Sequence, residues 1–64
     1  MELRKLKKGQ YFTLKPIEYP EERQVWVKGP YDRESKAFSC HRFDDTCLER
    51  MMKADKRVYT DFIF

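Results

Sequence analysis

The sequence has few glycines, few cysteines and no long apolar run. Its only glycines, Gly9 and Gly29, are too far apart to form the glycine-rich loop that cradles a phosphate group. No stretch approaches the roughly 18 apolar residues of a membrane span, and the opening residues MELRKLKK are not the apolar run of a signal peptide. These absences predict a cytoplasmic protein that does not contact a membrane and whose cysteines are free thiols.

Residues that could hold a metal or carry out catalysis are also scarce. Cys40, Cys47 and His41 are the only cysteines and histidine, whereas a structural zinc site uses four such ligands, often in close pairs. Cys40 and His41 are neighbours on an expected strand, so their side chains point to opposite faces and cannot form a thiolate–imidazole pair. Asp44 and Asp45 are typical of a turn or a cap. The sequence therefore predicts no metal, no cofactor and no enzymatic activity.

The charge is unevenly distributed along the chain. The 64 residues are 41% hydrophobic and 16% aromatic, which predicts one folded domain with a small core. The net charge is +3, and residues 1–8 account for all of it, because Arg4, Lys5, Lys7 and Lys8 are opposed only by Glu2. The other residues carry ten basic and ten acidic side chains. We therefore expect a basic N-terminal arm over residues 1–8 and a formally neutral domain over residues 9–64.

Alternation of apolar and polar residues predicts β-structure. The expected strands are Gln10–Lys15, Gln24–Lys28, Ala37–Phe43 and Arg57–Phe64. Gly29 and Pro30 should bend or bulge the second strand, and the polar residues 32–36 should form the turn of a hairpin. The acidic, proline-containing residues 17–23 are expected to form an exposed loop.

Residues 46–53 have two interpretations. Thr46 and Glu49 fit a capping box followed by good helix formers, which would give a short helical turn. The other interpretation, which we favour, is a short strand over Leu48–Lys53 that pairs with the last strand. With that strand the chain has about five short strands, and the sequence predicts an all-β, SH3-like, partly open barrel.

Two segments resemble a known group of proteins. WVKGPYDRESKAFSCHRFDD (Trp26–Asp45) and the closing KADKRVYTDFIF are similar to short bacterial proteins of mobile or integrated genetic elements. This resemblance implies a bacterial cytoplasmic setting and an SH3-like barrel. It implies no activity and assigns no functional residue.

The alternation also separates an expected interior from an expected surface. The interior residues are Phe12, Leu14, Val25, Val27, Phe38, Cys40, Val58 and Phe62. Aromatic and basic side chains then remain outside or at the rim: Tyr11, Trp26, Lys28, His41, Phe43 and Tyr59. Together with Arg4, Lys5, Lys7 and Lys8 of the arm, they are the candidate binding residues. For Trp26, burial in a second small core is an equal alternative.

These features predict a non-catalytic binding module. Aromatic rings next to basic side chains can stack on bases and contact phosphates, which favours nucleic acid as the partner. The alternative is a protein–protein or self-associating accessory protein with no role in nucleic-acid binding. In that case the apolar C-terminal residues 62–64 could pair with a second copy to form a homodimer. The expected partner is nucleic acid or a protein of the same genetic element.

Overall fold

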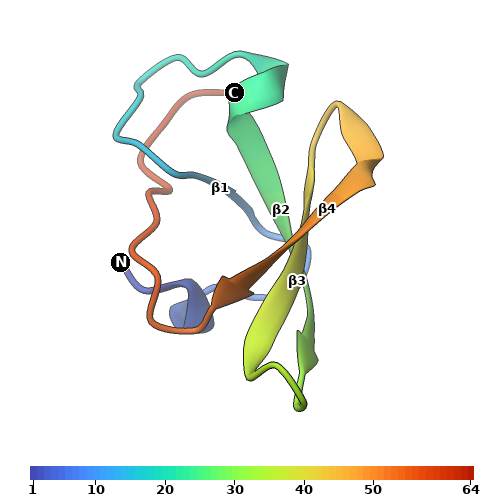
Figure 1. Cartoon of the computed structure of the whole chain (residues 1–64). Helices are drawn as coiled ribbons and strands as arrows, with labels where there is room; N and C mark the ends of the chain where they lie inside the picture. The colour runs from blue at the N-terminus through green and yellow to red at the C-terminus, as the bar shows by residue number, and fades with distance from the viewer.

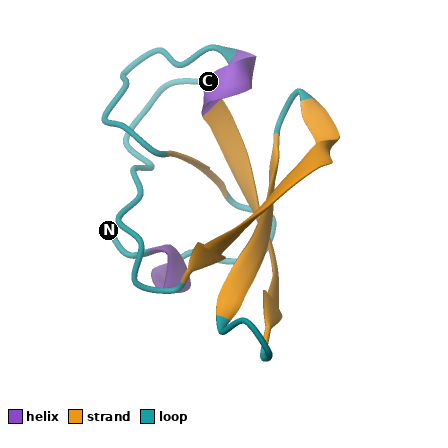
Figure 2. Cartoon of the chain, viewed as in Figure 1, coloured by secondary structure: helices purple, strands orange, loops and turns teal.

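The computed structural model describes all 64 residues, and its main element is one four-stranded antiparallel sheet in the order β1-β2-β3-β4 (Figure 1). The strands are β1 (Tyr11–Thr13), β2 (Val25–Asp32), β3 (Ala37–Arg42) and β4 (Asp45–Lys53). Two single-turn 3-10 helices, η1 (Leu3–Lys5) and η2 (Glu22–Gln24), precede β1 and β2 (Figure 2). The prediction of a mainly β protein is confirmed.

The hairpin of β2 and β3 lies at the centre of the sheet. Its register places Lys28 opposite Cys40 and then shifts between Lys28 and Tyr31. The shift coincides with Gly29 and Pro30, which confirms the expected bulge. A Cβ atom on Gly29 would lie 2.0 Å from the carbonyl oxygen of Ser39, so this close approach of the two strands requires glycine.

Residues 45–53 form a strand and not a helical turn. β4 pairs with β3 from Ala37 opposite Lys53 to His41 opposite Glu49. The ladder hydrogen bonds and the buried side chain of Met52 outweigh the local helix preference of this segment. The strand begins at Asp45, three residues before the expected Leu48.

The last eight residues run beside β1 but form no regular strand. Thr13 and Tyr59 exchange two backbone hydrogen bonds of 2.9 and 3.0 Å, and an isolated bridge joins Arg57 to Glu2. The expected strand over 57–64 is therefore reduced to isolated bridges. β1 itself ends at Thr13, two residues earlier than expected, because the chain bends at residues 14 and 15.

Residues 1–8 fold back onto the end of β4. The Leu3 N–H donates to the Lys56 carbonyl and the Arg4 N–H to the Ala54 carbonyl, both at 2.9 Å. The Met1 carbonyl accepts a 2.8 Å hydrogen bond from the Val58 N–H. Figure 1 shows the blue η1 beside the orange turn that follows β4. The N-terminal residues are therefore part of the fold, and Leu3 and Leu6 anchor them in the core.

The core lies on one face of the sheet, under the N-terminal residues. Its buried members are Leu3, Leu6, Phe12, Trp26, Cys40, Met52 and Val58, with Leu14, Phe38 and Leu48 packed against them. The predicted interior is confirmed for Phe12, Cys40 and Val58. It is wrong for the direction of β2, where Trp26 and Lys28 face the core and Val27 is only half-buried. Val25 is buried as expected, but outside this cluster.

Candidate binding surfaces

Two of the candidate binding residues are not accessible. The side chain of Trp26 is 7% exposed and that of Lys28 is 5% exposed. The Lys28 ammonium donates to the Leu6 carbonyl and lies 4.0 Å from the centre of the Phe38 ring. Burial lowers the pKa of Lys28, and attraction to the negative charge of a Cys40 thiolate partly opposes this shift. Both side chains are core residues, so the expected surface position is wrong for Lys28, and for Trp26 the alternative of burial is confirmed.

The basic residues of the arm meet a second basic segment. Because η1 is hydrogen-bonded to residues 54 and 56, Arg4 and Lys5 lie beside Lys53, Lys56 and Arg57. We call residues 1–8 and 53–57 the basic end. It contains seven basic and two acidic side chains, a net charge of +5, and the rest of the chain carries −2. The contribution of residues 53–57 to a basic surface was not predicted. The net charge of residues 9–64 is zero, and this total conceals the basic run KADKR at residues 53–57.

Most cations of the basic end are free of ion pairs. Arg4 is paired with Glu2 at 3.1 Å, whereas the five lysines and Arg57 form no salt bridge and are exposed. Met1, Glu2, Lys5, Asp55 and Arg57 line a hollow of about 390 Å³. The basic end is therefore an open, positively charged surface on an ordered backbone.

Three aromatic rings form a second surface, on the opposite face of the sheet from the core. Tyr11, Phe43 and Phe64 contact one another edge to face, with ring centres 4.9 to 6.0 Å apart. Their exposed fractions are 42%, 36% and 51%. We call these three residues the aromatic cluster. Tyr11 and Phe43 are brought together as candidate residues, and the contribution of Phe64 was missed because residues 57–64 do not follow the expected strand.

His41 and Tyr59 are only half-buried, and neither belongs to the basic end. Cross-strand pairing places Tyr11 beside Val27, Val27 beside His41, and His41 beside Glu49. The Glu49 carboxylate accepts a hydrogen bond from the Ser39 hydroxyl at 2.5 Å. The cross-strand row of Tyr11, Val27, His41 and Glu49 therefore ends in an acidic side chain and contains no lysine. Tyr59 instead lines a hollow beside the C-terminal residues.

The cysteines and the histidine do not form a reactive pair. Cys40 is fully buried, and its pKa is raised by burial, an effect partly offset by the Gly29 N–H and by Lys28. His41 points away from it, and Cys47 is exposed on β4 with a free thiol. The structure contains no group of three or more His, Cys, Asp or Glu side chains that could hold a metal ion.

Comparison with known proteins adds no family. Neither short helix has the length and apolar character needed to cross a membrane. No family model matches the chain, and no significant similarity was found to a curated protein or to a solved structure.

Proposed function

We propose that this chain is a small non-catalytic binding module that contacts nucleic acid through the basic end. The observation that carries the proposal is the packing of residues 1–8 against the turn after β4, held by the hydrogen bonds of Leu3 and Arg4. This packing gathers two basic segments that are far apart in the sequence into one surface. It also explains how a chain with a net charge of only +3 presents a local charge of +5.

Unpaired cations on a hydrogen-bonded backbone favour phosphate binding. A protein that neutralises phosphates with lysine and arginine gains affinity by releasing condensed counterions. Lys5, Lys53 and Lys56 form no ion pair, so their charges are available to phosphates. The backbone that carries them is already ordered, which reduces the entropy lost on binding. The buried Trp26 cannot act as a stacking platform, so binding is expected to depend mainly on phosphates and little on base sequence.

We further propose that the sheet extends into an SH3-like, partly open barrel with residues 57–64 as its fifth strand. The reciprocal hydrogen bonds of Thr13 with Tyr59 and the 2.8 Å bond from the Ile63 N–H to the Glu18 carbonyl support this extension. Amide exchange tests it. Slow exchange of the Thr13, Tyr59 and Ile63 amides is expected for a closed edge, and fast exchange of all three would contradict the fifth strand.

A salt titration tests the proposed nucleic-acid binding. Affinities for a single-stranded DNA, a double-stranded DNA and an RNA oligonucleotide are measured between 50 and 300 mM salt. The variant carries Lys5→Gln, Lys53→Gln, Lys56→Gln and Arg57→Gln. We expect weaker binding and a slope of log affinity against log salt that is shallower by about 0.7–0.9 for each phosphate that the variant no longer neutralises. Deletion of residues 2–8 is unsuitable, because it removes Leu3 and Leu6 from the core.

The matched control carries Arg33→Gln and Lys36→Gln in the exposed turn between β2 and β3. These changes also remove exposed cations but lie outside the basic end, so the salt slope should stay close to that of the unchanged protein. The proposal is wrong if no oligonucleotide binds at 50 mM salt. It is also wrong if the control weakens binding as much per charge as the variant does.

The aromatic cluster favours a second candidate function, association with a protein or with another copy of the chain. Exposed aromatic side chains are common at the energetic centres of protein interfaces, and Ile63 next to the cluster is 63% exposed. Sedimentation over a wide concentration range tests self-association. A dimer that dissociates in the Phe64→Ser variant would support it, and a monomer at high concentration would contradict it.

A further inference from the structure

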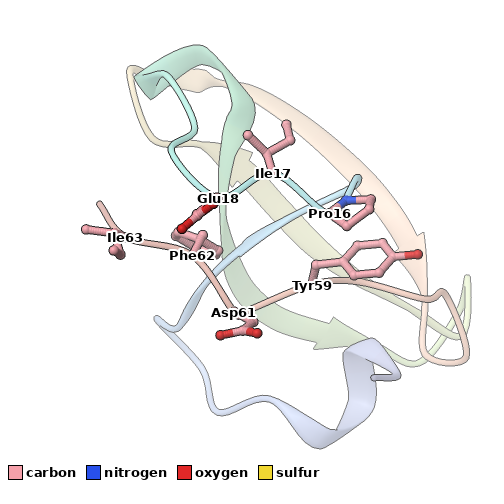
Figure 3. Close-up of a pocket in the computed structure, with 7 residues that line it drawn as sticks. All are labelled: Pro16, Ile17, Glu18, Tyr59, Asp61, Phe62 and Ile63. Atoms are coloured by element: carbon pink, nitrogen blue, oxygen red, sulfur yellow. The ribbon is translucent and has the colours of Figure 1, made fainter.

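A hollow of about 450 Å³ lies between the C-terminal residues and the segment after β1. Figure 3 shows its lining residues, which come from two segments that are far apart in the sequence: Pro16, Ile17 and Glu18 from one, and Tyr59, Asp61, Phe62 and Ile63 from the other. We call this space the C-terminal hollow. Its volume is within the range of small-ligand sites, and none of its lining residues belongs to the basic end.

The C-terminal hollow lies between two separate backbone contacts of these segments. Thr13 is hydrogen-bonded to Tyr59 at one end, and the Glu18 carbonyl accepts from the Ile63 N–H at the other. Between these points the chain bends at residues 14 and 15 and passes through Pro16, which has no N–H to donate. The two segments therefore separate over a few residues, while both ends remain tied.

The charges in the C-terminal hollow all have the same sign. Glu18 and Asp61 contribute two carboxylates, and no lysine, arginine or histidine lines the space. Neither carboxylate forms an ion pair with any cation of the chain. Both carboxylates are exposed at the rim of a partly apolar lining, and their charge favours a cationic ligand over an anionic one. A positively charged head with apolar neighbours therefore complements this space.

Backbone N–H groups in the lining, and at Thr60 beside it, have no partner within the chain, which suits a peptide ligand. The N–H groups of Ile17, Thr60 and Asp61 form no hydrogen bond within the chain. An extended peptide can use such groups for main-chain pairing while its side chains provide specificity. We propose that the C-terminal hollow binds an extended segment of a partner protein that presents one arginine or lysine between apolar residues. The cation lies against Glu18 and Asp61, and its apolar neighbours contact Ile17 and Phe62.

Three short peptides test this site on the full-length chain. The probes are acetylated, amidated Gly-Val-Arg-Val-Gly and the same peptide with Gln or Glu in place of Arg, each added up to 5 mM in 50 mM salt. Amide chemical shifts of the ¹⁵N-labelled chain are followed. The Arg peptide should shift the amides of Glu18, Tyr59, Asp61 and Ile63, with an affinity about five-fold or more above that of the Gln peptide. The Glu peptide should not bind.

A charge variant of the lining makes the test specific. In Glu18→Gln with Asp61→Asn, the Arg and Gln peptides should bind equally. The control variant, Glu22→Gln with Glu34→Gln, makes the same change in net charge at residues outside the C-terminal hollow and should keep the preference for Arg. Both variants are compared after their amide spectra confirm the unchanged fold.

Several results would overturn the proposal. They are no shift with any peptide, shifts confined to other residues, equal binding of all three peptides, and a preference for Arg that persists in the lining variant. The amide shifts of the same residues could also change when the protein is concentrated without peptide. That result would mean that the C-terminal hollow binds the basic end of a second copy instead. Oligonucleotide affinity is expected to be unchanged in the lining variant, so the result does not depend on the proposed nucleic-acid binding.

Discussion

Phe12 lies directly opposite Trp26 across the β1–β2 ladder, and both rings are buried in the core. We expect Trp26→Ala to lower the free energy of unfolding by about 3–5 kcal/mol, because it removes the largest side chain of a small core. Tyr19→Ala, at a site that is 68% exposed, should change it by less than about 0.5 kcal/mol. Urea denaturation followed by circular dichroism measures both. Comparable stabilities for the two variants would contradict the buried position of Trp26.

The close approach of Gly29 to Ser39 gives a second prediction. Gly29→Ala places a methyl group against the Ser39 carbonyl, which cannot move without disturbing the β2–β3 ladder. We expect a loss of about 1–3 kcal/mol in stability. Glu34→Ala, in the exposed turn of the same hairpin, should be nearly neutral. Equal thermal midpoints for the unchanged protein and Gly29→Ala would show that the strands do not approach so closely.

Thiol labelling distinguishes the two cysteines. Cys47 is exposed on β4 and Cys40 is fully buried, so an aromatic disulfide reagent should label one thiol per chain rapidly in buffer and two in denaturant. Cys47→Ser should abolish the rapid reaction and leave the slow one. Rapid labelling of two thiols in the folded protein would contradict the burial of Cys40.

The raised pKa of Cys40 predicts how stability depends on pH. Burial raises this pKa above its ordinary value of 9.0, so above pH 9 the unfolded chain loses the proton while the folded chain keeps it. The folded state then binds more protons, and its stability falls as pH rises towards the folded pKa. The lowered pKa of Lys28 acts in the opposite direction below 10.5, because there the unfolded chain binds more protons.

Comparison with Cys40→Ala isolates the thiol. Cys47 and Lys28 are present in both chains, so most of their effects cancel in the difference between the two stabilities. The free energy of unfolding of the unchanged protein should exceed that of Cys40→Ala by a constant amount at pH 7–8. Above pH 9 this difference should shrink by at most about 1.4 kcal/mol per pH unit. Urea denaturation under reducing conditions measures it. A difference that stays constant up to pH 10.5 would mean that the thiol is not buried in the folded state.

Sequence patterns predicted the positions of the central strands better than the direction of their side chains. The β2–β3 hairpin and its bulge follow from alternation and from Gly29-Pro30. The core face of β2 does not, because Val25, Trp26 and Val27 are all apolar and alternation alone cannot choose between the two faces. The choice depends on Phe12 and Leu6, which meet β2 only in the folded chain.

The ends of the chain were harder to predict, for two different reasons. The sequence of β4 has a local capping-box pattern that favours a helical turn. The segment forms a strand because it pairs with β3. The basic end depends on hydrogen bonds between residues 3–4 and 54–56, which no local pattern shows. A charge total over residues 9–64 therefore missed Lys53, Lys56 and Arg57, although each is visible in the sequence.

The same long-range hydrogen bonds have a kinetic consequence. The Leu3 and Val58 bonds connect the two ends of the chain, so the entropy of closing nearly the whole chain as one loop opposes their formation. During synthesis, the Leu3 N–H cannot find its partner until Lys56 has left the ribosome. The β2–β3 hairpin can form earlier from local contacts, and docking of the N-terminal residues is the late step that completes the core.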